Sequence, residues 1–120
     1  MVIRMMRMWT VLVLATATVH AIDTCTCPDS CSIKEELGRG TWLLLHQIAE
    51  NTEPTTANEE VFRTFIHSLS QLYPCDVCRE HFQRNLVDFD IQLDPMNMCQ
   101  FHNLVNEQLD KPLHPCDVVV

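Results

Sequence analysis

The sequence predicts an all-α protein built as a four-helix bundle. Two glycines in 120 residues are too few for the many turns of a β-sandwich, and five phenylalanines with one tyrosine give little of the aromatic content typical of strands. Four stretches carry apolar residues at helical spacing, joined by short polar or proline-containing links. The length corresponds to one domain.

The first two predicted helices have broad apolar stripes. Helical spacing of apolar residues predicts a helix over residues 34–50, ended by the polar stretch around Pro54. Its expected buried residues are Leu37, Leu44, Leu45 and Ile48. The second helix begins at Thr56, whose spacing to Glu59 is that of a capping box, and stops before Pro74. Its apolar stripe comprises Val61, Phe62, Phe65, Ile66, Leu69 and Leu72.

The last two predicted helices have clear start signals. The third begins at Cys75, directly after a proline, and frays near Asp88. Its expected buried side is Val77, Phe82 and Leu86. Asp94 and Pro95 supply an N-cap and a first-turn proline for the fourth helix, which runs to about Asp110. The expected apolar side of this helix is Met98, Phe101, Leu104, Val105 and Leu109.

Composition restricts the classes of function. Acidic residues outnumber basic residues sixteen to eight, giving a formal net charge of −8 without any basic stripe, which argues against a nucleic-acid-binding surface. A chain of this size buries only about 60–65% of its unfolded surface on folding, so covalent or cofactor support of the core is expected. The seven cysteines are the candidates for covalent support.

Residues 1–21 have the layout of a secretory signal peptide. Arg4 and Arg7 precede the apolar run Trp9–Val19, and the segment ends in Val-His-Ala. The apolar run is about half of the roughly 20 residues that a spanning helix needs, so a retained membrane anchor is the less favoured alternative. We therefore expect the chain in the secretory pathway, in the endoplasmic reticulum lumen or secreted, where cysteines form disulfides. Contact with a membrane is expected only if this segment is retained.

Cys75 and Cys78 form a C-x-x-C motif in the first turn of the third predicted helix. Unpaired backbone N–H groups and the helix dipole stabilise a thiolate there, which makes such cysteines reactive. The pair can form and break a small-loop disulfide. A zinc half-site and a static disulfide are the alternatives that the motif alone leaves open.

Two helix faces carry candidate ligand-binding residues. Cys99, His102, Asn103 and Asn106 fall at i, i+3, i+4 and i+7 on the fourth helix, where they can present donors and acceptors to a flat polar ligand. The alternative is a solvated helix face. The first helix carries Arg39, Trp42 and His46, with Gly38 and Gly40 flanking the arginine. A planar cofactor could stack on the Trp42 and His46 rings, although such residues are more often part of a core.

The segments LGRGTWLLLHQIA, YPCDVC and CQFHNLVNEQLDKP, followed by Cys116, resemble the Erv/ALR family of FAD-dependent sulfhydryl oxidases over residues 37–116. The most specific part is C-x-x-H-N-x-V-N-x-x-L-x-K, from Cys99 to Lys111. The resemblance implies a family domain over residues 33–120, with four helices, a short fifth helix and FAD at the end of the bundle. It also implies a homodimer. The chain departs from the family pattern at Asn97, His114 and Pro115.

The resemblance also implies roles for individual residues. Cys75 and Cys78 would be the redox disulfide, with Cys78 next to the flavin and Cys75 taking electrons from a reduced protein or small dithiol. Cys99 and Cys116 would form a structural disulfide, and no metal is implied. Electrons would pass from the flavin to dioxygen, giving hydrogen peroxide. The residues expected to line FAD are Gly38, Arg39, Trp42, His46, Tyr73, His102, Asn103, Asn106 and Lys111.

Residues 22–32 are expected to form a cysteine-bearing arm before the domain. Its cysteines, Cys25, Cys27 and Cys31, match by role the electron shuttle that many family members carry on a flexible tail. Three cysteines cannot all pair within one chain, so one would be free or would join two subunits. The alternative is that these cysteines form structural disulfides in the arm and transfer no electrons.

Two rival functions remain open at the level of sequence. Cys75, Cys78, Cys99 and His102 have a spacing that suits a four-ligand zinc module. The chain could also be a disulfide-stapled secreted protein without catalysis. Neither rival gives a role to Trp42 or Lys111.

Overall fold

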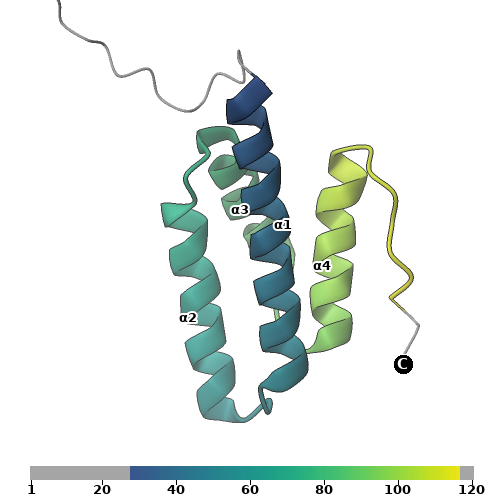
Figure 1. Ribbon diagram of the computed structural model, residues 1–120. Coiled ribbons are helices and arrows are strands. Elements are labelled where there is room, and N and C mark those ends of the chain that lie inside the picture. The colour runs from purple at the N-terminus through teal and green to yellow at the C-terminus, as the bar shows by residue number, and fades with distance from the viewer. Residues whose placement is uncertain (1–27, 117–120) are drawn as a thin grey trace, which may run out of the picture.

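The computed structural model describes residues 28–116, with side chains described from residue 33. Four α-helices make up this part of the chain, as the sequence predicts, and it contains no strand. Figure 1 shows α4 beside α1, with the segment after α4 running back along it. The close helix pairs are α1 with α4 and α2 with α3. The predicted signal peptide and two arm cysteines, Cys25 and Cys27, lie outside the described residues.

Helix α1 spans Pro28–Asn51. The predicted start at residue 34 is therefore wrong, and Cys31, expected in the arm, lies within the helix. A proline at the first helical position lacks only an N–H group that would have no partner inside the helix, which explains why Pro28 begins the helix rather than preventing it. The predicted end of the helix is correct to within one residue.

Helix α2 spans Thr56–Leu72, and its N-cap is Thr55 rather than the predicted Thr56. The Thr55 hydroxyl accepts the Asn58 N–H at 3.2 Å. Glu59 does not complete a capping box, because its carboxylate accepts the Leu93 N–H at 3.1 Å from the segment before α4. The two adjacent threonines offer the same capping chemistry, so spacing alone did not separate them.

Helices α3 and α4 follow their start signals closely. Helix α3 spans Asp76–Asp88, with Cys75 as its N-cap, and α4 spans Pro95–Gln108. The Asp94 carboxylate caps α4 by accepting the Asn97 N–H at 2.8 Å. Helix α4 ends two residues before the predicted Asp110, which adopts a left-handed conformation with φ of 52°. The described chain after α4, as far as Cys116, contains no fifth helix, which corrects that expectation.

The core is formed by buried residues of α1, α2, α4 and the α3–α4 connection, with partly buried residues of α3 packed against it. The sequence reading missed the two connection residues, Ile91 and Leu93, which are both buried. Asn97 holds this connection by accepting the Gln92 N–H at 2.8 Å and donating to the Asp90 carbonyl at 3.0 Å. The fully or nearly buried core residues are Leu45, Ala49, Phe62, Ile66, Ile91, Leu93, Met98 and Phe101.

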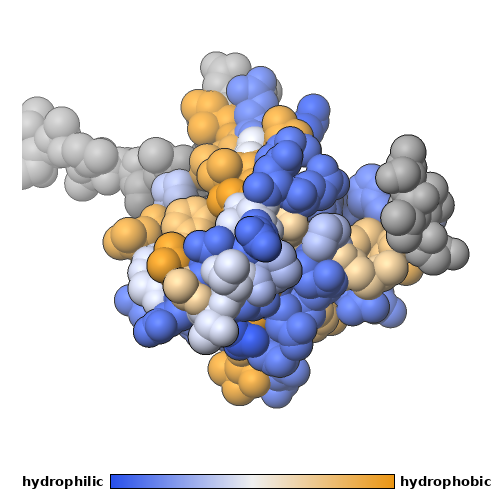
Figure 2. Space-filling model, turned by 90° about the horizontal axis from the view of Figure 1, so that it is seen from below, coloured by the Kyte–Doolittle hydropathy of each residue, from blue (hydrophilic) through white to orange (hydrophobic). Residues whose placement is uncertain are grey.

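Several apolar residues expected in the core face solvent instead. Leu44 is 52% exposed and Val61 is 67% exposed, and Val77 on α3 is 56% exposed. In so small a bundle each helix contacts its neighbours over a narrow face. The apolar residues of a stripe wider than that face therefore stay exposed to solvent. The other exposed residues that were expected to be buried are Phe65, Leu72 and Leu109. Seen from below, the surface is mostly hydrophilic, with separate hydrophobic patches (Figure 2).

Within residues 28–116, no helix has both the length and the apolar character needed to cross a membrane.

Candidate active site

A cavity of about 870 Å³ lies between α1, α3, α4 and the segment that follows α4. It falls within the range of roughly 300–1,000 Å³ typical of small-molecule sites. The Cys78 residue of the C-x-x-C motif lines this cavity. The residues predicted to bind a cofactor that also line it are Gly38, Arg39, Trp42, His46, Tyr73, His102, Asn106 and Lys111.

Aromatic rings from α1 and α4 form a platform in the cavity. The Trp42 and His102 rings are stacked, with centroids 3.9 Å apart and planes 9° apart. The His46 ring is tilted by 42° to Trp42, with the centroids 6.2 Å apart, so the ring that lies parallel to Trp42 is that of His102. His114, from the segment after α4, adds a ring 5.3 Å from His102. A planar aromatic ligand can bind against such a surface through offset or edge contacts.

Two histidines of this cluster are held in their neutral form. His46 Nε2 and His102 Nδ1 are 2.8 Å apart, a hydrogen bond that needs one nitrogen without a proton. Burial lowers the pKa of His102 to about 4, with further lowering by the nearby His46, His114 and Lys111. Burial also lowers the pKa of His46, against an opposing attraction from Glu50. At neutral pH both rings can therefore stack without carrying charge.

This cluster makes a prediction for stability in acid. Unfolded histidine titrates near pH 6.5, so between about pH 6.5 and 4 the unfolded chain binds a proton that folded His102 resists, and stability falls as pH falls. His102 is half-buried, and after allowing for solvent screening we expect a loss of about 1 kcal/mol, or about 4–8 °C in Tm, between pH 7 and 4.5. Thermal melting of wild type and His102→Gln at both pH values measures it. The prediction is contradicted if His102→Gln leaves the dependence of Tm on pH unchanged. It is also contradicted if the exposed-site control His67→Gln alters that dependence as much as His102→Gln does.

Positive charge collects around the cavity although the chain is acidic overall. Of the six Lys and Arg residues that follow residue 21, three line the cavity: Lys34, Arg39 and Lys111. Arg39 donates to the Glu35 carboxylate at 3.2 Å on the exposed surface of α1. A concentration of basic groups in a protein of formal charge −8 favours an anionic ligand at this place.

The C-x-x-C motif forms a disulfide between Cys75 and Cys78, whose Cα atoms are 5.2 Å apart. Cys75 is 7% exposed and caps α3, where its sulfur accepts the Cys78 N–H at 3.3 Å. Arg79 holds the turn before the motif by donating to the Tyr73 carbonyl at 3.1 Å and pairing with the Asp76 carboxylate. The N-terminus of α3 therefore supplies a donor to the Cys75 sulfur, the half of the disulfide that does not line the cavity.

A second disulfide joins Cys99 to Cys116, with Cα atoms 5.6 Å apart, and is the pair implied by the resemblance. Asn103 is not among the residues that line the cavity, and its expected contact with FAD stays a prediction. Its amide accepts the His114 N–H at 2.9 Å and donates to the His114 carbonyl at 2.7 Å. Asn103 and the disulfide together fasten the segment that places His114 in the cavity.

The zinc-binding alternative is contradicted by this arrangement. Cys75 and Cys78 are bonded to each other, and Cys99 is bonded to Cys116, so the three proposed cysteine ligands lie in two separate disulfides. His102 stacks on Trp42. Among residues 28–116 no group of three or more His, Cys, Asp and Glu residues could hold a metal ion.

Sequence reasoning missed several residues of the cavity wall. On α3, His81 and Asn85 were not predicted. With Cys78 and Phe82 they follow the i, i+3, i+4, i+7 pattern, which could have identified this face. His114 has no signal of this kind, because it lies in an irregular segment.

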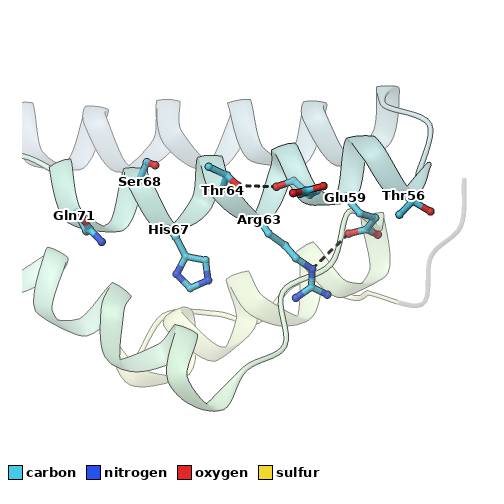
Figure 3. Close-up of a pocket in the computed structure, with 8 residues that line it drawn as sticks. Thr56, Glu59, Arg63, Thr64, His67, Ser68 and Gln71 are labelled. Atoms are coloured by element: carbon cyan, nitrogen blue, oxygen red, sulfur yellow. Dashed lines mark hydrogen bonds and ion pairs between the residues drawn. The ribbon is translucent and has the colours of Figure 1, made fainter.

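A shallow hollow on α2 is a second concave feature of the described residues. It measures about 560 Å³ and is lined by polar residues of this helix alone (Figure 3). Arg63 lies between Glu59, at 4.0 Å, and Asp90, at 2.8 Å. The lining residues are Thr56, Glu59, Glu60, Arg63, Thr64, His67, Ser68 and Gln71. With neither a disulfide nor a stacking surface, this hollow is the weaker candidate for a functional site.

The chain is similar in sequence to a family of known proteins. The profile of the Erv1 / Alr family matches residues 39–120. The "FAD-linked sulfhydryl oxidase ERV1" of Oryza sativa subsp. japonica is 41% identical over 93 residues, which cover 72% of this chain and 48% of that protein. The "FAD-linked sulfhydryl oxidase ERV2" of Saccharomyces cerevisiae is 32% identical over 95 residues, covering 73% and 48%. The chain thus spans about half the length of the curated relatives it matches.

Two solved structures from Saccharomyces cerevisiae have a similar fold. The FAD binding domain of Erv1 aligns with a TM-score of 0.63 and 32% identity, covering 69% of this chain and 86% of that one. The yeast Erv1 core aligns with a TM-score of 0.63 and 28% identity, covering 88% and 89%. The match of sequence over two thirds of the chain and the match of fold lead to one conclusion: the chain belongs to the Erv1/Alr family.

Proposed function

We propose that this protein is an FAD-linked thiol oxidase that forms disulfide bonds in reduced proteins or small dithiols and delivers the electrons to dioxygen as hydrogen peroxide. The observation that carries the proposal is that Cys78, one half of a helix-capping disulfide, lines the same cavity as the Trp42–His102 platform and the basic side chains. The match to relatives named FAD-linked sulfhydryl oxidases supports it.

The residues around the cavity fit FAD. The ligand has flat ring systems and a doubly charged pyrophosphate, and the cavity offers stacked rings together with Lys34, Arg39 and Lys111. Trp42 and His102 would hold a ring system, and the basic side chains would hold the phosphates. When bound, FAD supplies the two-electron oxidation of a thiolate and the reduction of dioxygen.

The chain's own contribution is thiol–disulfide exchange. A substrate thiolate attacks the Cys75 sulfur, the Cys75–Cys78 bond breaks, and Cys78 leaves as a thiolate at the cavity. A second substrate thiol then attacks the mixed disulfide, releasing the oxidised substrate and leaving Cys75 reduced. The pair has gained two electrons, and the two protons come from the substrate thiols. Cys75 is largely covered, so the incoming thiolate has a narrow approach.

The partners and compartment in this proposal follow from the sequence. Export through the secretory pathway is based on residues 1–21, whereas the yeast relative Erv1 is named mitochondrial. A homodimer would cover exposed apolar residues such as Leu44 and Val61. The arm cysteines Cys25 and Cys27, together with Cys31 in the first turn of α1, would relay electrons from bulky substrates to the C-x-x-C disulfide.

The proposal predicts a yellow protein. Purified full-length chain, incubated with FAD and freed of excess, should retain flavin absorbance and oxidise dithiothreitol with one hydrogen peroxide formed per disulfide. Absorbance and a peroxide assay measure the two quantities, with FAD alone as the control. A colourless preparation that stays inert in excess FAD would contradict the proposal.

A further inference from the structure

A reciprocal amide pair lies in the wall of the cavity and has no role in the proposal so far. Asn85 Nδ2 donates to Gln108 Oε1 at 3.0 Å, and Gln108 Nε2 donates to Asn85 Oδ1 at 2.9 Å. Asn85 is 8% exposed, which makes it one of the few buried polar residues of the described chain. Both residues line the cavity.

The pair connects the two halves of the bundle. Asn85 belongs to α3, which packs with α2, whereas Gln108 is the last residue of α4, which packs with α1. The neighbouring contact between these halves, Phe82 against Phe101 at 6.0 Å, is apolar and has no preferred register. Two parallel hydrogen bonds are directional, so the amide pair fixes how α3 sits relative to α4.

That relation matters for the redox disulfide. Asn85 lies seven residues after Cys78, two helical turns along the same face of α3. Among the residues expected to hold FAD, His102 lies on α4 and Lys111 lies in the segment that follows Gln108. The amide pair therefore joins the helix that carries the reacting sulfur to one of the two helices that carry the ligand platform.

We infer that Asn85 and Gln108 are positioning residues that hold Cys78 at its working distance from bound FAD. The inference rests on the proposed function. Reactions between oriented groups are sensitive to small displacements, and a 1 Å misplacement can cost about a hundredfold in rate. Removing the Gln108 amide leaves the buried Asn85 amide without that partner, and either substitution takes away the two hydrogen bonds that fix α3 relative to α4.

The test uses three variants of the pair in the full-length, FAD-loaded chain. Asn85→Leu and Gln108→Leu each remove the hydrogen bonds with little change in size. Exchanging the amides, Asn85→Gln with Gln108→Asn, keeps both hydrogen-bonding groups and their combined length. The matched control is Gln47→Leu, which removes an exposed amide that interacts with Asn51 on α1. Gln108 is exposed, so its substitution serves even if Asn85→Leu does not fold.

Each single substitution should lower kcat for dithiothreitol oxidation about tenfold or more, with KM within about twofold of wild type. In a Cys75→Ala background it should also weaken the thiolate-to-flavin absorption per bound FAD, a signature that does not depend on turnover. The exchanged pair should recover to within about threefold of wild type. Gln47→Leu should match wild type.

Two results would overturn the inference while leaving the proposed function intact. In the first, wild type binds FAD and oxidises dithiothreitol, and each single variant has a kcat no lower than that of Gln47→Leu. The other is an exchanged pair as slow as the single variants. A wild type that neither binds FAD nor oxidises the dithiol would instead remove the proposed function, on which the inference depends.

Discussion

Replacing Cys78 with alanine is expected to abolish thiol oxidation, and replacing Cys75 is expected to do the same. The two variants should differ in their spectra. With Cys75→Ala, the remaining thiol lies at the cavity wall, so a thiolate-to-flavin charge-transfer absorption should appear. With Cys78→Ala, the remaining sulfur is that of buried Cys75, which does not line the cavity, and the band should be absent.

Visible absorbance spectra normalised to bound FAD measure this difference, together with dithiothreitol turnover. The control is Val87→Ala, an exposed position on the same helix, which should keep wild-type activity and show no such band. A band seen only in Cys78→Ala would reverse the order of the two cysteines. Full turnover in either cysteine variant would remove the disulfide from the mechanism.

Replacing Phe101 with alanine should have the largest effect on stability. Phe101 is 1% exposed, and its ring lies 6.0 Å from Trp42, 6.0 Å from Phe82 and 5.1 Å from Phe89. Truncating a buried phenylalanine costs about 3–5 kcal/mol, because the transfer energy is lost and a cavity remains. Domains are stable by about 5–15 kcal/mol in total, so the variant should be partly unfolded at 37 °C.

Urea unfolding of the chain, followed by circular dichroism, measures this loss. Leu72→Ala, at an exposed position, is the matched control and should change the free energy of unfolding by less than about 0.5 kcal/mol. A loss below about 1 kcal/mol for Phe101→Ala would show that the aromatic cluster is not the centre of the core. Phe101 also lines the cavity, so the same variant should bind FAD more weakly.

Most helix boundaries could be predicted because they depend on local chemistry. Asp94 and Pro95 start α4 as the sequence indicates, and the proline before Cys75 separates α2 from α3. Burial was harder to predict, because it depends on which helices meet. Ile91 lies in a connection without periodicity, and its burial depends on side chains such as Asn97 that fix that connection.

The sequence predicted many of the residues that line the candidate site, but not the contacts that these residues make with one another. Spacing along α4 identified His102 and Asn106 as cavity residues. It could not show that His102 would stack on Trp42 of another helix, or that Asn103 would bind the backbone of His114. Such pairings depend on how elements distant in sequence come together, and a periodicity within one helix carries no information about them.

The response of the FAD-loaded chain to dithiothreitol without oxygen tests most directly whether the disulfide and the cavity form one active site. Thiol exchange at Cys75 and Cys78 should carry electrons to the cavity, so the visible flavin absorbance should bleach within the time of turnover. Admitting oxygen should restore the absorbance and produce hydrogen peroxide. Flavin that stays oxidised in wild type, or bleaches as fast in Cys78→Ala, would contradict the claim that this disulfide and this cavity form one active site.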